Sequence, residues 1–253
     1  MNSNFRFLIF NLRCALVACA LLLAGCDSDS TPAASARILP QAPSGTGIVR
    51  GIVRFSGQAP EPRQIENQGC HTAAEPIFDE TVVVNSNGTL ANVIISIEGI
   101  AGGPFDGSSQ PQVKLDQKSC AFVPHVVAVQ VRQPLNVSTS DPTTHNVHYI
   151  PAKNPADNFG LRSKGESKTI SFEYAEVVRV KCDVHPWMTA YVGVFDHPYF
   201  AVTDDVGSFE VKNLPAGTYT LVAWHELFGK IEKQLQIKDA TPVEVEFEYA
   251  PPQ

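Results

Sequence analysis

The segment Val177-Val-Arg-Val-Lys-Cys182-Asp-Val-His185-Pro-Trp-Met188 indicates the type of fold most directly. From Val178 onward, apolar and polar side chains alternate, which is the period of a β-strand with one buried face. Val178, Val180 and Cys182 therefore share the inner face of a predicted strand. Pro186 interrupts the strand and favours a turn. The pattern predicts a thiol that points inward at the end of a strand, followed by a turn that carries His185 and Met188.

Short β-branched stretches separated by turn residues continue along the chain, which is typical of an antiparallel sandwich or barrel. In Val243-Glu-Val-Glu-Phe-Glu-Tyr249 the alternation is complete, and no stretch of a dozen residues has a helical period. The predicted fold class is all-β. Strands are expected over Val49–Phe55, Val82–Val84, Ala91–Ile97, Val126–Val131, Thr169–Tyr174, Val177–Cys182, Ala190–Phe195, Tyr219–Trp224 and Val243–Tyr249.

The N-terminal segment has the features of an export signal. Arg6 and Arg13 precede the apolar run 14–25, which is too short to span a bilayer but fits a signal peptide. Leu23-Ala-Gly-Cys26 resembles the bacterial lipoprotein cleavage motif, which implies a lipid anchor on Cys26. Asp27 then implies retention in the inner membrane. We expect a signal peptide over 1–25, a flexible tether over 26–46, and a membrane-anchored protein that faces the periplasm or the cell surface.

Charge and cysteine content limit the partners of the exported chain. Without Arg6 and Arg13, 17 basic residues remain against 26 acidic ones, a net charge near −9, which argues against a nucleic-acid partner. A disulfide between Cys70 and Cys120 is the default expectation in an oxidising compartment. The alternative that the residues leave open is a second metal site built from Cys70, His71, Cys120 and His125.

Cys182, His185 and Met188 follow one another at three-residue intervals, and Met188 is the only methionine after Met1. A thiolate, an imidazole and a thioether are three of the four ligands of a blue-copper site, in which two His and one Cys form a plane with a weak axial Met. The stretch 144–148 offers two candidates for the second imidazole, His145 and His148. Residues three apart on a strand face opposite sides, so only one of them can enter the site.

The ligand loop resembles that of the cupredoxins, and within that class it is most similar to amicyanin, whose loop is also Cys-x-x-His-x-x-Met with Pro after the His. His145-Asn-Val-His148 matches the amicyanin pattern His-Asn-Val-His, in which the first His is the ligand. The resemblance covers residues 104–196 and implies a Greek-key β-sandwich with one type 1 copper per chain. It assigns the four ligands as His145, Cys182, His185 and Met188.

Three neighbours of these ligands are expected to support the site. Asn146 is predicted to tie the two ligand segments together, as residues around metal ligands generally do. Pro186 has no N–H to donate to the Cys182 sulfur. Trp187 is a candidate for the apolar patch through which electrons pass, although a core position is equally compatible with its sequence context.

A second resemblance covers the C-terminal part of the chain. Residues 200–226, with turns at Asp205-Val-Gly207 and Pro215-Ala-Gly217, resemble the carboxypeptidase-regulatory-like, transthyretin-type module. That module usually opens with a strand like Val49–Phe55. We therefore expect an Ig/transthyretin-like β-sandwich made of residues 47–103 together with 197–250, split around the copper domain. The alternative gives the early strands to the copper domain.

These features predict a membrane-tethered blue-copper protein that carries single electrons and exchanges them with a cytochrome or a periplasmic dehydrogenase. The alternative is a copper-binding, storage or sensing lipoprotein without electron-transfer duty. An enzyme is not expected, because the sequence has no His-x-His pairs of a multicopper oxidase. It also has no Cys-x-x-Cys-His haem motif and no Gly-x-Ser-x-Gly nucleophile motif.

Overall fold

The computed structural model describes residues 38–66, 76–238 and 241–251. These residues form eighteen β-strands and no helix, so the predicted all-β fold class is confirmed. None of them belongs to a helix that could cross a membrane. The predicted signal peptide, the lipid-attachment residue Cys26 and the disulfide candidate Cys70 lie outside the described residues.

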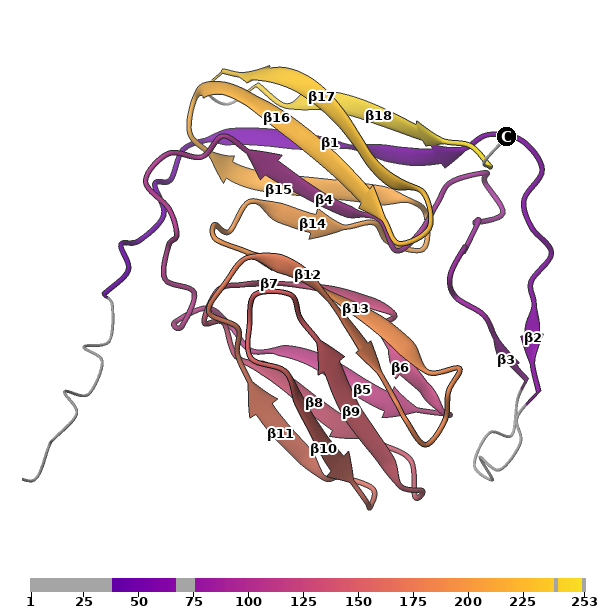
Figure 1. The fold of residues 1–253 in the computed structure, drawn as a ribbon. Coiled ribbons are helices and arrows are strands. Elements are labelled where there is room, and N and C mark those ends of the chain that lie inside the picture. Colours follow the sequence, from indigo (N-terminus) through magenta and orange to yellow (C-terminus); the bar gives the residue numbers. More distant parts are fainter. Residues whose placement is uncertain (1–37, 67–75, 239–240, 252–253) are drawn as a thin grey trace, which may run out of the picture. The chain divides into compact units, whose positions relative to one another are not determined.

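Nine strands between residues 113 and 195 form two sheets that enclose one hydrophobic core (Figure 1). The core contains the inward-facing side chains of both sheets, including Cys182 and Met188. The first sheet has the order β10 (Asp157–Leu161), β9 (His145–Ile150), β12 (Glu176–Lys181), β13 (Thr189–Phe195), β7 (Val126–Gln130). The second has the order β11 (Ser167–Ile170), β8 (Leu135–Thr139), β5 (Val113–Lys118), β6 (Ala121–Val123).

Strands from both ends of the chain form two further sheets around a second hydrophobic core. In both sheets, strands within residues 47–98 pair with strands within residues 200–249. One sheet has the order β15 (Ser208–Leu214), β1 (Gly47–Phe55), β18 (Val243–Tyr249). The other has the order β14 (Phe200–Val202), β4 (Ile94–Glu98), β16 (Gly217–His225), β17 (Gly229–Ile237).

The structure departs from the predicted strands in two places. Residues 82–84 form only an isolated bridge, between Val84 and Leu90. The strand predicted over 169–174 is β11, which ends at Ile170. The cause is local, because the Asn154 side-chain oxygen accepts the backbone N–H groups of Glu173 and Tyr174 that a strand would have used. The antiparallel pattern expected from the sequence is also incomplete, since β1–β18, β5–β8 and β7–β13 are parallel pairs.

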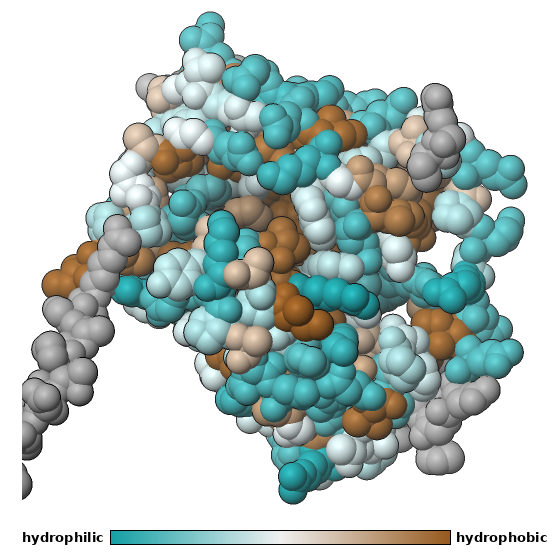
Figure 2. Space-filling view, in the orientation of Figure 1, coloured by the Kyte–Doolittle hydropathy of each residue, from teal (hydrophilic) through white to brown (hydrophobic). Residues whose placement is uncertain are grey.

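A short hairpin between β1 and β4 reaches the core that contains Cys182. It consists of β2 (Gln64–Ile65) and β3 (Ile77–Phe78), and its Ile77 side chain is buried in that core. Hydrophilic side chains cover much of the face shown in Figure 2, interrupted by small apolar patches. Single exposed apolar residues are ordinary in soluble domains. One of them, Val184, lies inside the predicted ligand loop and is 52% exposed.

Candidate metal centre

The predicted ligands come from two neighbouring strands and the hairpin loop between β12 and β13. His145 is the first residue of β9, and Cys182 follows directly after β12. Along β12 the side chains of Val178 and Val180 are buried while those of the residues between them are more exposed, so Cys182 continues the inner face. Two backbone hydrogen bonds close the loop: Cys182 N–H donates to the Met188 carbonyl (3.1 Å) and Met188 N–H to that of His185 (3.0 Å).

Three of the four predicted ligands converge. His145 Nδ1 lies 3.0 Å from His185 Nδ1, and Cys182 Sγ lies 3.8 Å from the same His185 nitrogen. One ligand atom from each residue falls within 4.8 Å of the others, and all three residues are buried. Met188 is also buried, in the same hydrophobic core. The thiol of Cys182 is free. The arrangement brings one sulfur and two imidazole nitrogens to a single point, which is the donor set of a trigonal copper site.

The environment favours the metal-binding form of the loop histidine. Burial lowers the pKa of His185 below its usual value, and the neighbouring His145 lowers it further. A neutral imidazole has the lone pair that a metal needs. The lowered pKa of His185 therefore favours the neutral form of its imidazole, which can bind a metal.

His148, the other candidate, lies on the opposite side of β9. Its Nδ1 is 2.9 Å from the Asp183 carboxylate, and it is partly exposed. Asn146 exchanges two hydrogen bonds with Asp183: its side-chain oxygen accepts the Asp183 N–H (2.6 Å) and its amide donates to the carboxylate (3.0 Å). The hydrogen bond from Lys181, followed by those from its other neighbours, lowers the pKa of Asp183. Asn146 thus joins the strand of one ligand to the loop of the others.

Trp187 and Pro186 complete the loop. The Trp187 ring lies 5.3 Å from that of His185, centroid to centroid, and its indole N–H donates to the Cys120 carbonyl (3.0 Å). Cys120 is disulfide-bonded. Cys182, the other described cysteine, has a free thiol. A disulfide sulfur is not a thiolate ligand, which argues against the alternative of a second metal site that includes Cys120.

Sequence reasoning missed a buried carboxylate beside the site. Asp141 is 4% exposed, and its Oδ2 lies 3.0 Å from His145 Nε2. The only signal in the sequence is its position four residues before His145, in a turn-rich segment. Sequence reasoning also missed Gln117, whose side-chain amide donates to the Asn146 carbonyl (3.0 Å) from the inner face of β5.

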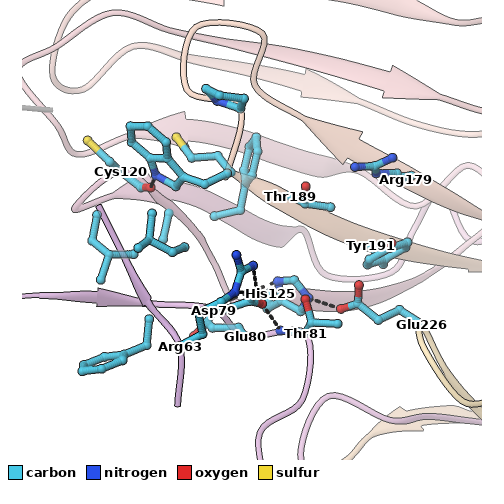
Figure 3. Close-up of a pocket in the computed structure, with 18 residues that line it drawn as sticks. Arg63, Asp79, Glu80, Thr81, Cys120, His125, Arg179, Thr189, Tyr191 and Glu226 are labelled. Atoms are coloured by element: carbon cyan, nitrogen blue, oxygen red, sulfur yellow. Dashed lines mark hydrogen bonds and ion pairs between the residues drawn. The ribbon is translucent and has the colours of Figure 1, made fainter. Parts of the chain in front are cut away.

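A cavity of about 230 Å³ adjoins the ligand loop (Figure 3). Pro186, Trp187 and Met188 line it together with residues from the β2–β3 hairpin. Another feature that the sequence did not reveal also lines this cavity: His125 Nε2 hydrogen-bonds the Glu226 carboxylate (Figure 3). Both side chains are about nine-tenths buried. This pair links the end of β16 to the segment that precedes β7.

No protein-family model and no curated protein matches the chain. Several solved structures are similar to part of it. A Cu-containing nitrite reductase from Thermus scotoductus has 20% identity and a TM-score of 0.30, and the match covers 34% of this chain and 22% of that one. A purple cupredoxin from Nitrosopumilus maritimus has 19% identity and a TM-score of 0.29, with 32% and 98% covered. Amicyanin from Paracoccus versutus has 18% identity and a TM-score of 0.30, with 40% and 96% covered.

Proposed function

We propose that the chain is a mononuclear type 1 copper protein of the cupredoxin kind that carries one electron at a time. The observation that carries the proposal is the convergence of His145 Nδ1, His185 Nδ1 and Cys182 Sγ in a buried site. Met188 would complete the set as the weak axial ligand. This donor set combines the soft thiolate and the imidazoles that copper sites use.

The chain's own residues supply the rigidity that an electron carrier needs. A bound copper ion would supply one-electron redox chemistry. His145 is fixed in a strand, and the loop of the other ligands is closed by its own backbone hydrogen bonds. Asn146 and Asp183 join these two segments. A site held from both sides changes little between oxidation states, and its burial excludes water from the ligand atoms.

The setting of this site is part of the proposal. We propose export, lipid attachment at Cys26 and a position facing the periplasm, supported by the apolar run 14–25 and the Leu23–Cys26 motif. The partner would be a cytochrome or a periplasmic dehydrogenase, and the chain would transform no substrate of its own. We also propose that residues 104–196 are the copper domain and that 47–103 with 197–250 are the second sandwich. The pairing of β1 with β15 and β18 supports this division.

The test is the visible spectrum of the full-length protein after addition of Cu(II). We expect an intense thiolate-to-copper band in the wild type and its loss in Cys182→Ser. Voltammetry should then show a reversible one-electron couple. A colourless protein with one copper bound per chain would refute the type 1 site and favour the copper storage or sensing alternative.

A further inference from the structure

The Asp141 carboxylate accepts three hydrogen bonds inside the protein. Its Oδ1 accepts the N–H of Ser119 (2.7 Å), and its Oδ2 accepts that of Cys120 (2.8 Å). The same Oδ2 lies 3.0 Å from Nε2 of His145, whose side chain is fully buried. Because both oxygens already accept backbone N–H groups, the carboxylate faces His145 as an acceptor. The proton of the neutral imidazole therefore resides on Nε2.

The proton on Nε2 of His145 determines that its Nδ1 can act only as a hydrogen-bond acceptor or a metal ligand. With Nε2 protonated, the Nδ1 of His145 carries a lone pair that is directed at His185 Nδ1, 3.0 Å away. Two neutral imidazole nitrogens can approach so closely only if one of them donates. With both imidazoles neutral in the metal-free protein, His185 is the hydrogen-bond donor of this pair, through Nδ1–H. Replacement of that proton by a metal ion would leave both Nδ1 atoms as ligands.

The same carboxylate stabilises an unusual turn between β5 and β6. Ser119 and Cys120 have φ angles of 53° and 57°, a left-handed conformation that non-glycine residues rarely adopt. Asp141 binds the N–H groups of both residues, and the carbonyl of Cys120 accepts the indole N–H of Trp187. Trp187 in turn packs on His185. The turn therefore connects Asp141 and His145 to the other predicted histidine ligand.

We propose that Asp141 is a positioning residue of the metal centre: it holds His145 as the Nε2–H tautomer and, as an anion, strengthens Nδ1 as a donor to Cu(II). The proposal rests on the proposed copper function. Carboxylate partners of metal-bound histidines fix the tautomer and raise the basicity of the ligand. A more basic imidazole and a nearby negative charge stabilise Cu(II) more than Cu(I), so they lower the reduction potential.

The test compares Asp141→Asn with wild type in the full-length protein. Asn has the same size but accepts through a single oxygen, so at least one of the three donors loses its partner. We expect Cu(II) binding to weaken by about 10- to 100-fold, the usual effect of removing an outer partner of a metal ligand. Cu(I) binding should change much less. A tenfold loss confined to Cu(II) corresponds to a rise in potential of about 59 mV.

Asp116→Asn is the matched control, since Asp116 carries the same charge in the same sandwich but hydrogen-bonds only the hydroxyls of Ser138 and Ser140 among the described residues. The control should change the Cu(II)-to-Cu(I) affinity ratio less than Asp141→Asn does. If both variants changed the Cu(II)-to-Cu(I) affinity ratio equally, the effect of Asp141 would be that of any nearby negative charge, and the proposal would be overturned. Equal weakening of Cu(II) and Cu(I) would assign Asp141 a structural role only and would also overturn it.

A measurement on the metal-free wild type needs no variant to fold and no copper to bind. Nitrogen-15 NMR of the imidazoles, with the His145 signals assigned by their loss in His145→Ala, should show Nε2–H on His145 and Nδ1–H on His185. Nδ1–H on His145 would overturn the proposal even if the copper spectrum were as expected. Conversely, a protein that shows the expected tautomers but develops no thiolate-to-copper band would contradict the proposed function and leave the role of Asp141 at His145 intact.

Discussion

Acid should destabilise the second sandwich through His225, the last residue of β16. This side chain is 1% exposed and stacks on Phe228 at a centroid distance of 4.6 Å. Its Nδ1 accepts the backbone N–H of Leu227 (3.1 Å), which leaves the proton on Nε2. Nε2 has no hydrogen-bond partner among the described residues. A second proton on this ring would displace the Leu227 N–H and bury a charge, and burial accordingly lowers the pKa of His225 to about 4.

The sign and size of the effect follow from proton linkage. In the unfolded chain His225 titrates near pH 6.5, so below that pH the unfolded state binds more protons than the folded state. The free energy of unfolding therefore decreases as the pH falls from 6.5 toward 4 and levels off below that. One pKa unit corresponds to about 1.4 kcal/mol. Protonation of His225 therefore lowers the free energy of unfolding, relative to its value well above pH 6.5, by about 2 kcal/mol at pH 5 and about 3 kcal/mol at pH 4.

The variant His225→Asn isolates this contribution. The Asn oxygen can accept the Leu227 N–H, as Asn does in turns, but it has no proton to gain. Urea denaturation of the metal-free protein, followed by tryptophan fluorescence, to which Trp224 in the same strand contributes, gives the free energy of unfolding at pH 7 and pH 5. The decrease in the free energy of unfolding from pH 7 to pH 5 should be about 2 kcal/mol smaller in the variant than in the wild type. Burial lowers the pKa of His197 and His185 as well, and their contribution remains in both proteins. Equal losses in variant and wild type would refute the reasoning.

Three further predictions concern the metal centre. His145→Ala should abolish the thiolate-to-copper band while His148→Ala retains it, because His148 bonds Asp183 and points away from Cys182; loss of the band in both variants would contradict this assignment. Pro186→Ala introduces an N–H that can donate to the Cys182 sulfur, so voltammetry should show a higher reduction potential than in wild type, and an unchanged or lower value would count against the idea. At free copper concentrations above Kd, the Tm should rise in proportion to the logarithm of the copper concentration, and a chelator should reverse the rise. A Tm that copper does not change would argue against a site present only in the folded state.

The parts of the site that could be predicted from the sequence depend on the alternation of buried and exposed side chains along a single strand. The pattern through Val178 and Val180 placed Cys182 on an inner face, and the structure buries all three residues. The same two-residue period separated His145 from His148, and in the structure the first is buried and the second partly exposed. Both inferences needed only the direction of successive side chains on one strand.

The parts that the sequence did not reveal depend on contacts between distant segments or on buried polar residues. His125 and Glu226 are 101 residues apart, and no local sequence pattern predicts that they form a hydrogen bond. The strand β5 was not predicted because Gln117, although fully buried, reads as a surface residue. Its amide is compatible with the core because it donates to the Asn146 carbonyl. The buried position of Asp141 could not be predicted either. Its hydrogen-bond donors, the N–H groups of Ser119 and Cys120, come close to it only after the turn between β5 and β6 has folded.

Strand register is what turns these residues into one site. β9 and β12 pair antiparallel with Lys181 opposite His148 and Val180 opposite Tyr149. Continuing this register sets Cys182 opposite Val147, and the burial along β9 shows that Val147 shares its inner face with His145. A slip of one residue would bring Asn146 and His148 inward and turn His145 to solvent. The hydrogen bonds between Asn146 and Asp183 oppose that slip, because both residues lie on the outer side, directly beside the ligands. The outer polar network would therefore support the proposed metal binding by fixing the register of the strands whose inner faces carry the predicted ligands.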